Sequence, residues 1–167
     1  MSKKNRIVWA CLFLLTICFM PMNAQQIKSP DGKVNVDYPG GKTSASFNVS
    51  YVKDGRKVNV FTLSSVGLLT GVGCEMKLVS VSKPKYLKES YTMLSGKRKG
   101  CTNEGNEAVF SFMNGKREKT DIRFRVYNNG IAFRYEYEPR KATEIKDELT
   151  AYKVPEGIKR WTQKYNV

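Results

Sequence analysis

The stretch from Thr120 to Glu138, TDIRFRVYNNGIAFRYEYE, decides the fold. Apolar and charged side chains alternate on both sides of Asn129-Gly130, a pair that favours a two-residue type I′ turn because both central residues of that turn need positive φ. The stretch therefore predicts an antiparallel hairpin with one apolar face. The predicted facing pairs on that face are Val126–Phe133, Phe124–Tyr135 and Ile122–Tyr137.

The other face of this predicted hairpin is charged. In the same register Arg123 lies opposite Glu136, and Arg125 lies opposite Arg134. Two arginines opposite each other repel, so we expect a carboxylate from a neighbouring strand, or water, between them. A slip of one residue would place aromatic side chains opposite arginines. One dry face and one wet face are typical of a sheet that packs against a second sheet.

Shorter segments of the same kind fill much of the chain after residue 24. Alternating apolar residues predict strands over 34–38, 45–51, 57–63, 75–81 and 108–113. Asp54-Gly55 and Asn114-Gly115 mark turns between them. The only helical candidate is Ala142–Tyr152, and its last residues look extended. These patterns predict an all-β fold, an antiparallel β-sandwich.

The first 24 residues have the composition of a secretory signal peptide. Basic residues at positions 3, 4 and 6 precede an apolar run over 7–20, which is too short to span a bilayer as a mature helix. We expect cleavage after Ala24, which would leave residues 25–167 in the periplasm or outside the cell with no stable membrane anchor. The alternative interpretation is an uncleaved membrane anchor.

Composition excludes several classes of activity. The 167 residues contain 29 Lys and Arg, 15 Asp and Glu, and no histidine, so a Ser-His-Asp or Cys-His nucleophile cannot be built. Residues 25–167 number 143 and carry a formal charge of +11, because three cations and no acids lie in the first 24 residues. Export and the scattering of the cations argue against nucleic acid as a partner. The densest basic cluster, Gly96–Gly100, is typical of a solvated loop tip.

Two cysteines remain after residue 24, Cys74 and Cys101. In an exported chain such a pair can be oxidised to a disulfide. The alternative is two separate buried thiols, and the sequence is compatible with both. Neither cysteine belongs to a CxxC motif or to a cluster with metal-ligand spacing. We therefore assign no redox role, no metal site and no cofactor to this chain.

Carboxylates are the groups left that could do acid–base chemistry, as they do in glycosidases. The candidate sets are Glu104 with Glu107, Glu136 with Glu138, and Glu144 with Asp147 and Glu148. For each set a solvated face is the simpler interpretation. Asn103, Asn106 and Glu107 fall in what reads as a turn-rich loop after Gly96, and loops often carry function. The residues by themselves thus indicate an exported β-sandwich that serves as a binding or accessory module.

Three blocks of the chain carry a family resemblance: QQIKSPDGK over 25–33, GKRKGCTNEGNE over 96–107 and DIRFRVYNNGIAFRY over 121–135. With the segment from DELT at 147–150 to RWTQKYN at 160–166, they resemble the N-terminal domain of glycoside hydrolase family 97, a family of α-glucosidases and α-galactosidases from Bacteroidetes. The resemblance implies a sandwich of the galactose-mutarotase-like supersandwich type, packed against a catalytic (β/α)₈ barrel.

In that family the catalytic carboxylates lie on the barrel, and a calcium ion helps to shape the active site. This chain ends at Val167, before such a barrel, so the resemblance implies an incomplete, non-catalytic sandwich that supports the barrel and borders its pocket for α-linked oligosaccharides. No catalytic residue is carried over, and calcium is expected only in the full-length enzyme. Incompleteness would leave strand edges and an apolar face uncovered, so we expect poor solubility of residues 25–167 alone.

The resemblance also implies contacts with the sugar. The residues concerned are Asn103, Asn106, Glu107, Trp161 and Lys164. They match parts of the family that lie towards the barrel and its cleft, where Trp161 would stack on a sugar ring; a structural aromatic at a sheet end is the alternative. The alternative function is a stand-alone exported carbohydrate-binding or scaffold module. Hydrolysis of α-glucosides and the coding region beyond Val167 would distinguish the two functions.

Overall fold

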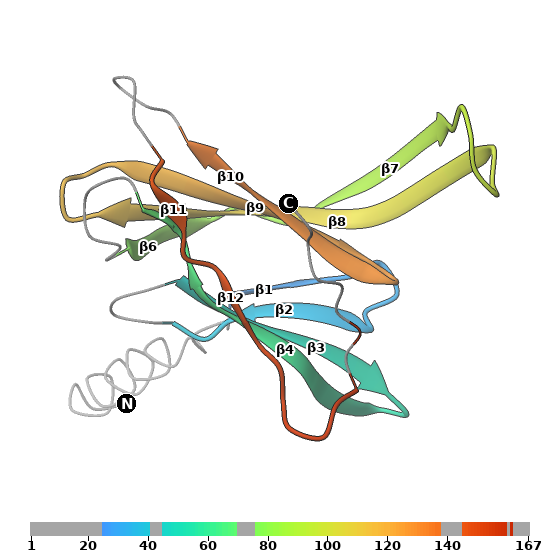
Figure 1. The fold of residues 1–167 in the computed structure, drawn as a ribbon, viewed down its shortest axis with the longest axis horizontal. Coiled ribbons are helices and arrows are strands. Elements are labelled where there is room, and N and C mark those ends of the chain that lie inside the picture. Colours follow the sequence, from blue (N-terminus) through green and yellow to red (C-terminus); the bar gives the residue numbers. More distant parts are fainter. Residues whose placement is uncertain (1–24, 41–44, 70–75, 138–144, 160, 162–167) are drawn as a thin grey trace, which may run out of the picture.

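A computed structural model of the chain describes residues 25–40, 45–69, 76–137, 145–159 and 161 (Figure 1). These residues form twelve β-strands and no helix, so the prediction of an all-β fold is confirmed. The strands are β1 (Gln25–Lys28), β2 (Val34–Tyr38), β3 (Ala45–Lys53), β4 (Arg56–Val66), β5 (Leu68–Leu69), β6 (Met76–Val81), β7 (Lys85–Thr92), β8 (Gly100–Asn114), β9 (Lys119–Tyr127), β10 (Gly130–Tyr137), β11 (Asp147–Glu148) and β12 (Ala151–Lys153).

Two antiparallel sheets face each other as a sandwich (Figure 1). The first sheet has the strand order β1-β2-β3-β4-β12. The second has the order β10-β9-β8-β6, and β7 pairs with the other half of β8. A short pair, β5 with β11, lies outside both sheets. The predicted antiparallel sandwich is therefore confirmed.

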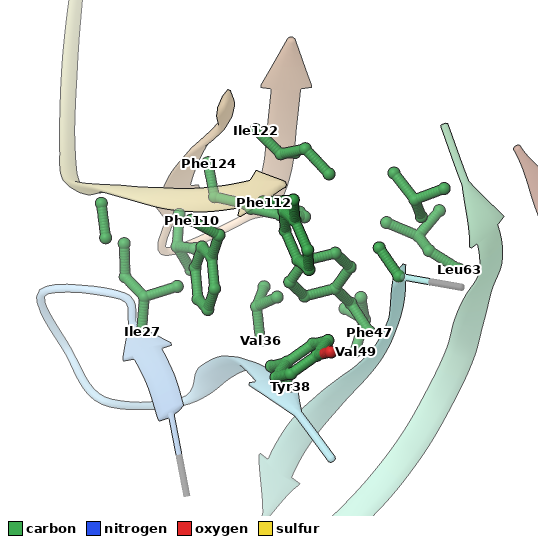
Figure 2. Close-up of a cluster of buried hydrophobic side chains, with 14 of the residues drawn as sticks. Ile27, Val36, Tyr38, Phe47, Val49, Leu63, Phe110, Phe112, Ile122 and Phe124 are labelled. Carbon is green, nitrogen blue, oxygen red and sulfur yellow. The ribbon is translucent and has the colours of Figure 1, made fainter. Parts of the chain in front are cut away.

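The core between the sheets is built around Phe47 of β3 (Figure 2). Its ring lies edge-on to Phe110 of β8, with 5.1 Å between ring centroids, and 4.6 Å from Phe124 of β9. Tyr38 of β2 lies 5.4 Å from the same ring. Such aromatic pairs contribute about 0.5–1.5 kcal/mol beyond the burial of their area. The aromatic cluster therefore connects β2 and β3 of the first sheet with β8 and β9 of the second.

The β9–β10 hairpin has the predicted faces but not the predicted register. Its apolar side meets the core as expected, with Ile122, Phe124 and Val126 buried. The turn, however, consists of Asn128-Asn129, so that Tyr127 pairs with Gly130. The observed pairs on the apolar side are Val126–Ile131, Phe124–Phe133 and Ile122–Tyr135, each shifted by two residues from the prediction. A shift of two keeps every side chain on its face, which is why alternation alone could not detect the error.

The backbone of this turn is not that of a type I′ turn. Among the described residues other than glycine, only Asp54, Ser65 and Arg117 have positive φ. Neither Asn128 nor Asn129 belongs to that set, so the predicted type I′ turn at Asn129-Gly130 was wrong. Asn128 instead uses its side chain, whose Oδ1 accepts a hydrogen bond from the Asp31 amide at 3.1 Å in the β1–β2 turn.

The remaining strand predictions fare better. The predicted segments are found as β2, β3, β4, β6 and β8, and β6 is described from Met76 onward. Asp54 (φ 50°) and Gly55 (φ 74°) both have positive φ between β3 and β4, as a type I′ hairpin turn requires. The described part of the helical candidate, 145–152, contains β11 and β12 instead. The sequence patterns missed β1 and β7.

The segment after β10 joins the two sheets. Tyr135 on β10 hydrogen-bonds through its hydroxyl to Thr150, and the Leu149 amide donates to the Gly67 carbonyl at 3.0 Å. β12 then pairs with β4 at the edge of the first sheet. Within the described ranges no helix is long and apolar enough to cross a membrane, and the predicted signal peptide, 1–24, lies outside those ranges.

Candidate functional site

The β7–β8 hairpin projects beyond the rest of the sandwich (Figure 1). β9 pairs with β8 from Gly105 to Met113, and the first residues of β8, 100–104, pair with β7. Residues 90–100, which include the predicted basic loop tip, are all exposed. Both faces of the hairpin are therefore presented outside the core.

The outer face of the second sheet carries a ladder of ion pairs centred on Glu107 of β8. Its Oε1 accepts a hydrogen bond from Arg123 Nη1 at 2.6 Å, and its Oε2 accepts one from Arg125 Nε at 2.8 Å. The side chain is only 12% exposed. A carboxylate from a neighbouring strand thus neutralises Arg125, as expected, although the arginine that faces Arg134 is Arg123.

Two further carboxylates complete this ladder. Glu136 on β10 accepts hydrogen bonds from Arg123 Nε and Nη2 at 2.6 and 2.7 Å and from Arg134 Nη2 at 2.7 Å. Glu89 on β7 pairs with Arg125 at 2.9 Å. The ladder therefore crosses four strands, β7 to β10, with three arginines against three glutamates.

The arginines set the protonation of the ladder. Hydrogen bonding from Arg123 lowers the pKa of Glu136 to about 2, against the opposing effect of burial. Burial acts to raise the pKa of Glu107, but hydrogen bonds from Arg125 and Arg123 outweigh it, and the pKa of Glu107 is lowered. Both carboxyl groups are therefore ionised at neutral pH.

This arrangement is poorly suited to catalysis by the carboxylates. An ionised carboxylate has no proton to donate, and the arginines occupy the lone pairs that a nucleophile would need. Glu104 and Glu107 lie on opposite faces of β8, because their spacing is odd, so they cannot form the facing pair of a glycosidase.

A shallow pocket of about 190 Å³ opens over the ladder, lined by Arg123, Arg125, Tyr127, Ala132, Phe133 and Arg134. The ion pairs of the ladder connect neighbouring strands from β7 to β10 and so stabilise the second sheet.

Three of the residues predicted to contact sugar lie on a strand. Asn103, Asn106 and Glu107 belong to β8, so their placement in a turn-rich loop was wrong. The alternation of β8 puts Asn103 and Glu107 on the outer face and Asn106 on the inner face. Asn106 Nδ2 donates to the Lys28 carbonyl at 2.8 Å, which ties β8 to β1. The structure therefore does not bring the three together in one site.

The other predicted contacts lie near the end of the chain. Trp161 is 96% exposed, so its ring is free to meet a ligand or another surface. Lys164 lies outside the described residues. Cys101 is half-buried on β8, whereas Cys74 lies outside the described residues, so the disulfide stays a prediction.

The sequence patterns missed one group of side chains with ligand-binding chemistry. Tyr86 and Lys88 of β7 surround Glu104 of β8, with Lys88 Nζ 2.7 Å from Glu104 Oε1. Lys88, and after it Tyr86, lower the pKa of Glu104. The available signal for β7 was the run KYLKESYT after Pro84, which holds two tyrosines and a threonine.

Calcium, which the family resemblance implies for the full-length enzyme, has no fitting donor set among the residues that the structure describes. They contain no group of three or more Asp, Glu, His or Cys side chains that could hold a metal ion. The densest set of carboxylates, in the ladder, is held by guanidinium groups, which would repel a cation.

Comparison with known proteins assigns this sandwich to a family. The family model described as glycosyl-hydrolase 97 N-terminal matches residues 27–167. The chain belongs to this family. The resemblance inferred from the sequence blocks is therefore confirmed for the glycoside hydrolase 97 N-terminal domain. A search of curated proteins found no match.

Solved structures share the fold of this glycoside hydrolase 97 domain. Two structures of a glycoside hydrolase family 97 enzyme from Pseudoalteromonas sp. strain K8, a variant in complex with panose and a complex with acarbose, align with a TM-score of 0.61 at 22% identity. A second variant from that strain aligns with a TM-score of 0.58 at 21% identity. The alignments cover 75% of this chain and 20% of each of those chains, so the chain spans about a fifth of their length.

Proposed function

We propose that residues 25–167 form the non-catalytic N-terminal β-sandwich of an exported family 97 α-glycosidase, supporting the catalytic barrel and bordering its carbohydrate-binding pocket. The observation that carries this proposal is the family match over residues 27–167, joined to the 20% share that the chain occupies in full enzymes of the family. The alignment covers about a fifth of such an enzyme, and we expect the catalytic barrel in the part that it does not cover.

The charges of the sandwich support a non-catalytic role. Glu107 and Glu136 are held ionised by arginines, and Glu104 pairs with Lys88. A general acid needs a raised pKa, and the pKa values of these three carboxyls are all lowered. Catalytic carboxylates are therefore expected from another part of the enzyme.

The shape of the domain and its relatives support the bordering role. The projecting β7–β8 hairpin extends both of its faces beyond the core, as an element that reaches towards a neighbouring domain would (Figure 1). Family 97 structures from Pseudoalteromonas sp. strain K8 were solved in complex with panose and with acarbose. We infer α-linked oligosaccharides as the substrate class of the whole enzyme, and the pattern of residues 1–24 supports export to the periplasm or beyond.

Reconstitution tests this proposal. The DNA beyond codon 167 is sequenced, and the barrel that we expect it to encode is expressed with and without residues 25–167. Panose hydrolysis should require the barrel, should rise when residues 25–167 are present, and should be absent for residues 25–167 alone. Turnover of panose by this chain unaided, or the lack of any encoded barrel, would contradict the proposal and favour a stand-alone module.

A further inference from the structure

The inner face of the projecting hairpin continues the face of β8 that lines the core. Ala108, Phe110 and Phe112 are buried on that face. Towards the tip of the hairpin the same face becomes polar. The side chains that follow, called here the hairpin strip, belong to three cross-strand pairs: Tyr86–Asn106, Lys88–Glu104 and Ser90–Thr102.

Contacts within the hairpin strip hold its side chains in place. Lys88 Nζ lies 2.7 Å from Glu104 Oε1 across the hairpin. The Ser90 and Thr102 hydroxyls are hydrogen-bonded at 3.1 Å. Asn106 is anchored by its bond to the Lys28 carbonyl. Groups that are positioned in advance lose less entropy when a ligand binds.

The strip is open to solvent although it holds an aromatic ring. Tyr86 is 53% exposed, and the side chains of Lys88 and Glu104 are 59% and 39% exposed. Two residues along a strand rise about 6.6–6.8 Å, so the three rows span roughly 13 Å, longer than one pyranose ring. The strip is therefore an exposed surface that is long enough for more than one sugar ring.

The chemistry of the strip favours a neutral polyhydroxylated ligand. The charges of Lys88 and Glu104 cancel, so the strip does not select an ion. Carboxylate, ammonium and amide groups accept from and donate to hydroxyl groups, and hydrogen bonds to charged groups are the stronger kind. An exposed tyrosine ring presents a flat apolar face that packs against the C–H face of a sugar.

We propose that the hairpin strip is a saccharide-binding subsite, in which the Tyr86 ring stacks on a pyranose and Glu104, Lys88 and Asn106 hydrogen-bond its hydroxyl groups. The choice of an α-linked glucose oligosaccharide as the ligand rests on the proposed function. The subsite is a binding surface and takes no part in bond cleavage.

Residue Tyr91 supplies a matched control. It lies on the same strand, β7, is 47% exposed, and its odd spacing from Tyr86 places it on the opposite face. Loss of either ring removes a similar exposed aromatic area from the same hairpin. Only the loss of Tyr86 should affect the proposed subsite.

The test is ligand-observed saturation-transfer NMR on the full chain as the host exports it, with maltotriose as the probe. Titration of the wild type should show saturable binding, which Tyr86→Ala should weaken about tenfold and Tyr91→Ala by less than about twofold. Glu104→Gln, which keeps the shape of the side chain, should weaken binding about fivefold through loss of a charge-assisted hydrogen bond. Equal thermal melting of the two tyrosine variants would show that both fold.

Two results would overturn the subsite: no saturable maltotriose binding by the folded wild type, or equal weakening by Tyr86→Ala and Tyr91→Ala. Either could occur while the reconstituted enzyme still hydrolyses panose, in which case the proposed function stands and the subsite alone fails. Conversely, binding that depends on Tyr86 in a chain without any encoded barrel would support the subsite and remove the enzyme proposal.

Discussion

At the scale of single residues, Glu107 is the side chain on which the charged face depends. It is nearly buried, and each of its oxygens receives a hydrogen bond from a different arginine of β9. Removing one partner from a desolvated charge cluster leaves the others uncompensated, which costs more than losing an exposed ion pair. The sequence predicted a carboxylate at this place because two arginines that face each other across the hairpin repel, but it could not identify the glutamate.

We predict that Glu107→Gln lowers the free energy of unfolding by about 1–3 kcal/mol at pH 7, measured by urea denaturation. The matched control is Glu89→Gln, which removes a carboxylate from the same Arg125 but at a side chain that is 48% exposed. Its effect should stay below about 1 kcal/mol. Equal losses in the two variants would contradict the central position of Glu107.

The stability difference between the wild type and Glu107→Gln should depend on pH. The pKa of Glu107 is lowered below its ordinary value of 4.5 in the folded chain, so its contribution is present above pH 4.5 and is lost as the pH falls through the folded pKa. The stability difference between wild type and Glu107→Gln should therefore shrink as the pH is lowered below 4.5. A difference that stays constant from pH 7 to pH 3 would refute this linkage.

At the scale of elements, the two hairpin turns show what local sequence can decide. Asp54-Gly55 forms the turn that its residue types favour, with both φ angles positive. Asn129-Gly130 has equally favourable residue types, yet the turn forms one residue earlier, with Asn128 bound to the β1–β2 turn. A contact between distant parts of the chain can thus outweigh a local turn preference.

This difference predicts opposite outcomes for two glycine substitutions. Gly55→Ala should lower the free energy of unfolding by about 1–2 kcal/mol, because alanine is strained at φ 74°. Gly130→Ala should change it by less than about 0.5 kcal/mol, since its φ is not in the left-handed region and no atom lies within 4 Å of the added Cβ. Chemical denaturation of both variants measures this. A larger loss for Gly130→Ala would restore the type I′ turn that the sequence predicted.

At the scale of the whole molecule, stability depends on the aromatic cluster that crosses between the sheets. Phe47 of the first sheet is fully buried against Phe110, Phe112 and Phe124 of the second. Interiors are packed closely, so a deleted ring leaves a cavity that neighbouring strands fill only in part. Phe47 and the rings around it therefore lie at the centre of the core between the two sheets (Figure 2).

We expect Phe47→Ala to lower the free energy of unfolding by about 3–5 kcal/mol, a large share of the stability of a typical domain. Phe61→Ala is the control, because Phe61 is only partly buried at the margin of the core, and it should cost about 1–2 kcal/mol. Thermal melts followed by near-ultraviolet circular dichroism report both. If Phe47→Ala melted like the control, the sheets would have to be held together elsewhere.

The sequence by itself determined the class of fold, the apolar face of each main strand, the Asp54-Gly55 turn and the family. These features depend on the two-residue period of each strand and on local turn chemistry. Both are set by neighbouring residues in the sequence and do not require contacts between distant strands. Only the tertiary structure decided the register of β9 with β10, the strand position of Asn103, Asn106 and Glu107, and the projecting hairpin with its strip of side chains. One reason is that a shift of two residues leaves the alternation of side chains unchanged. The other is that alternation does not reveal which strands pair with which part of β8, where β6, β7 and β9 all pair.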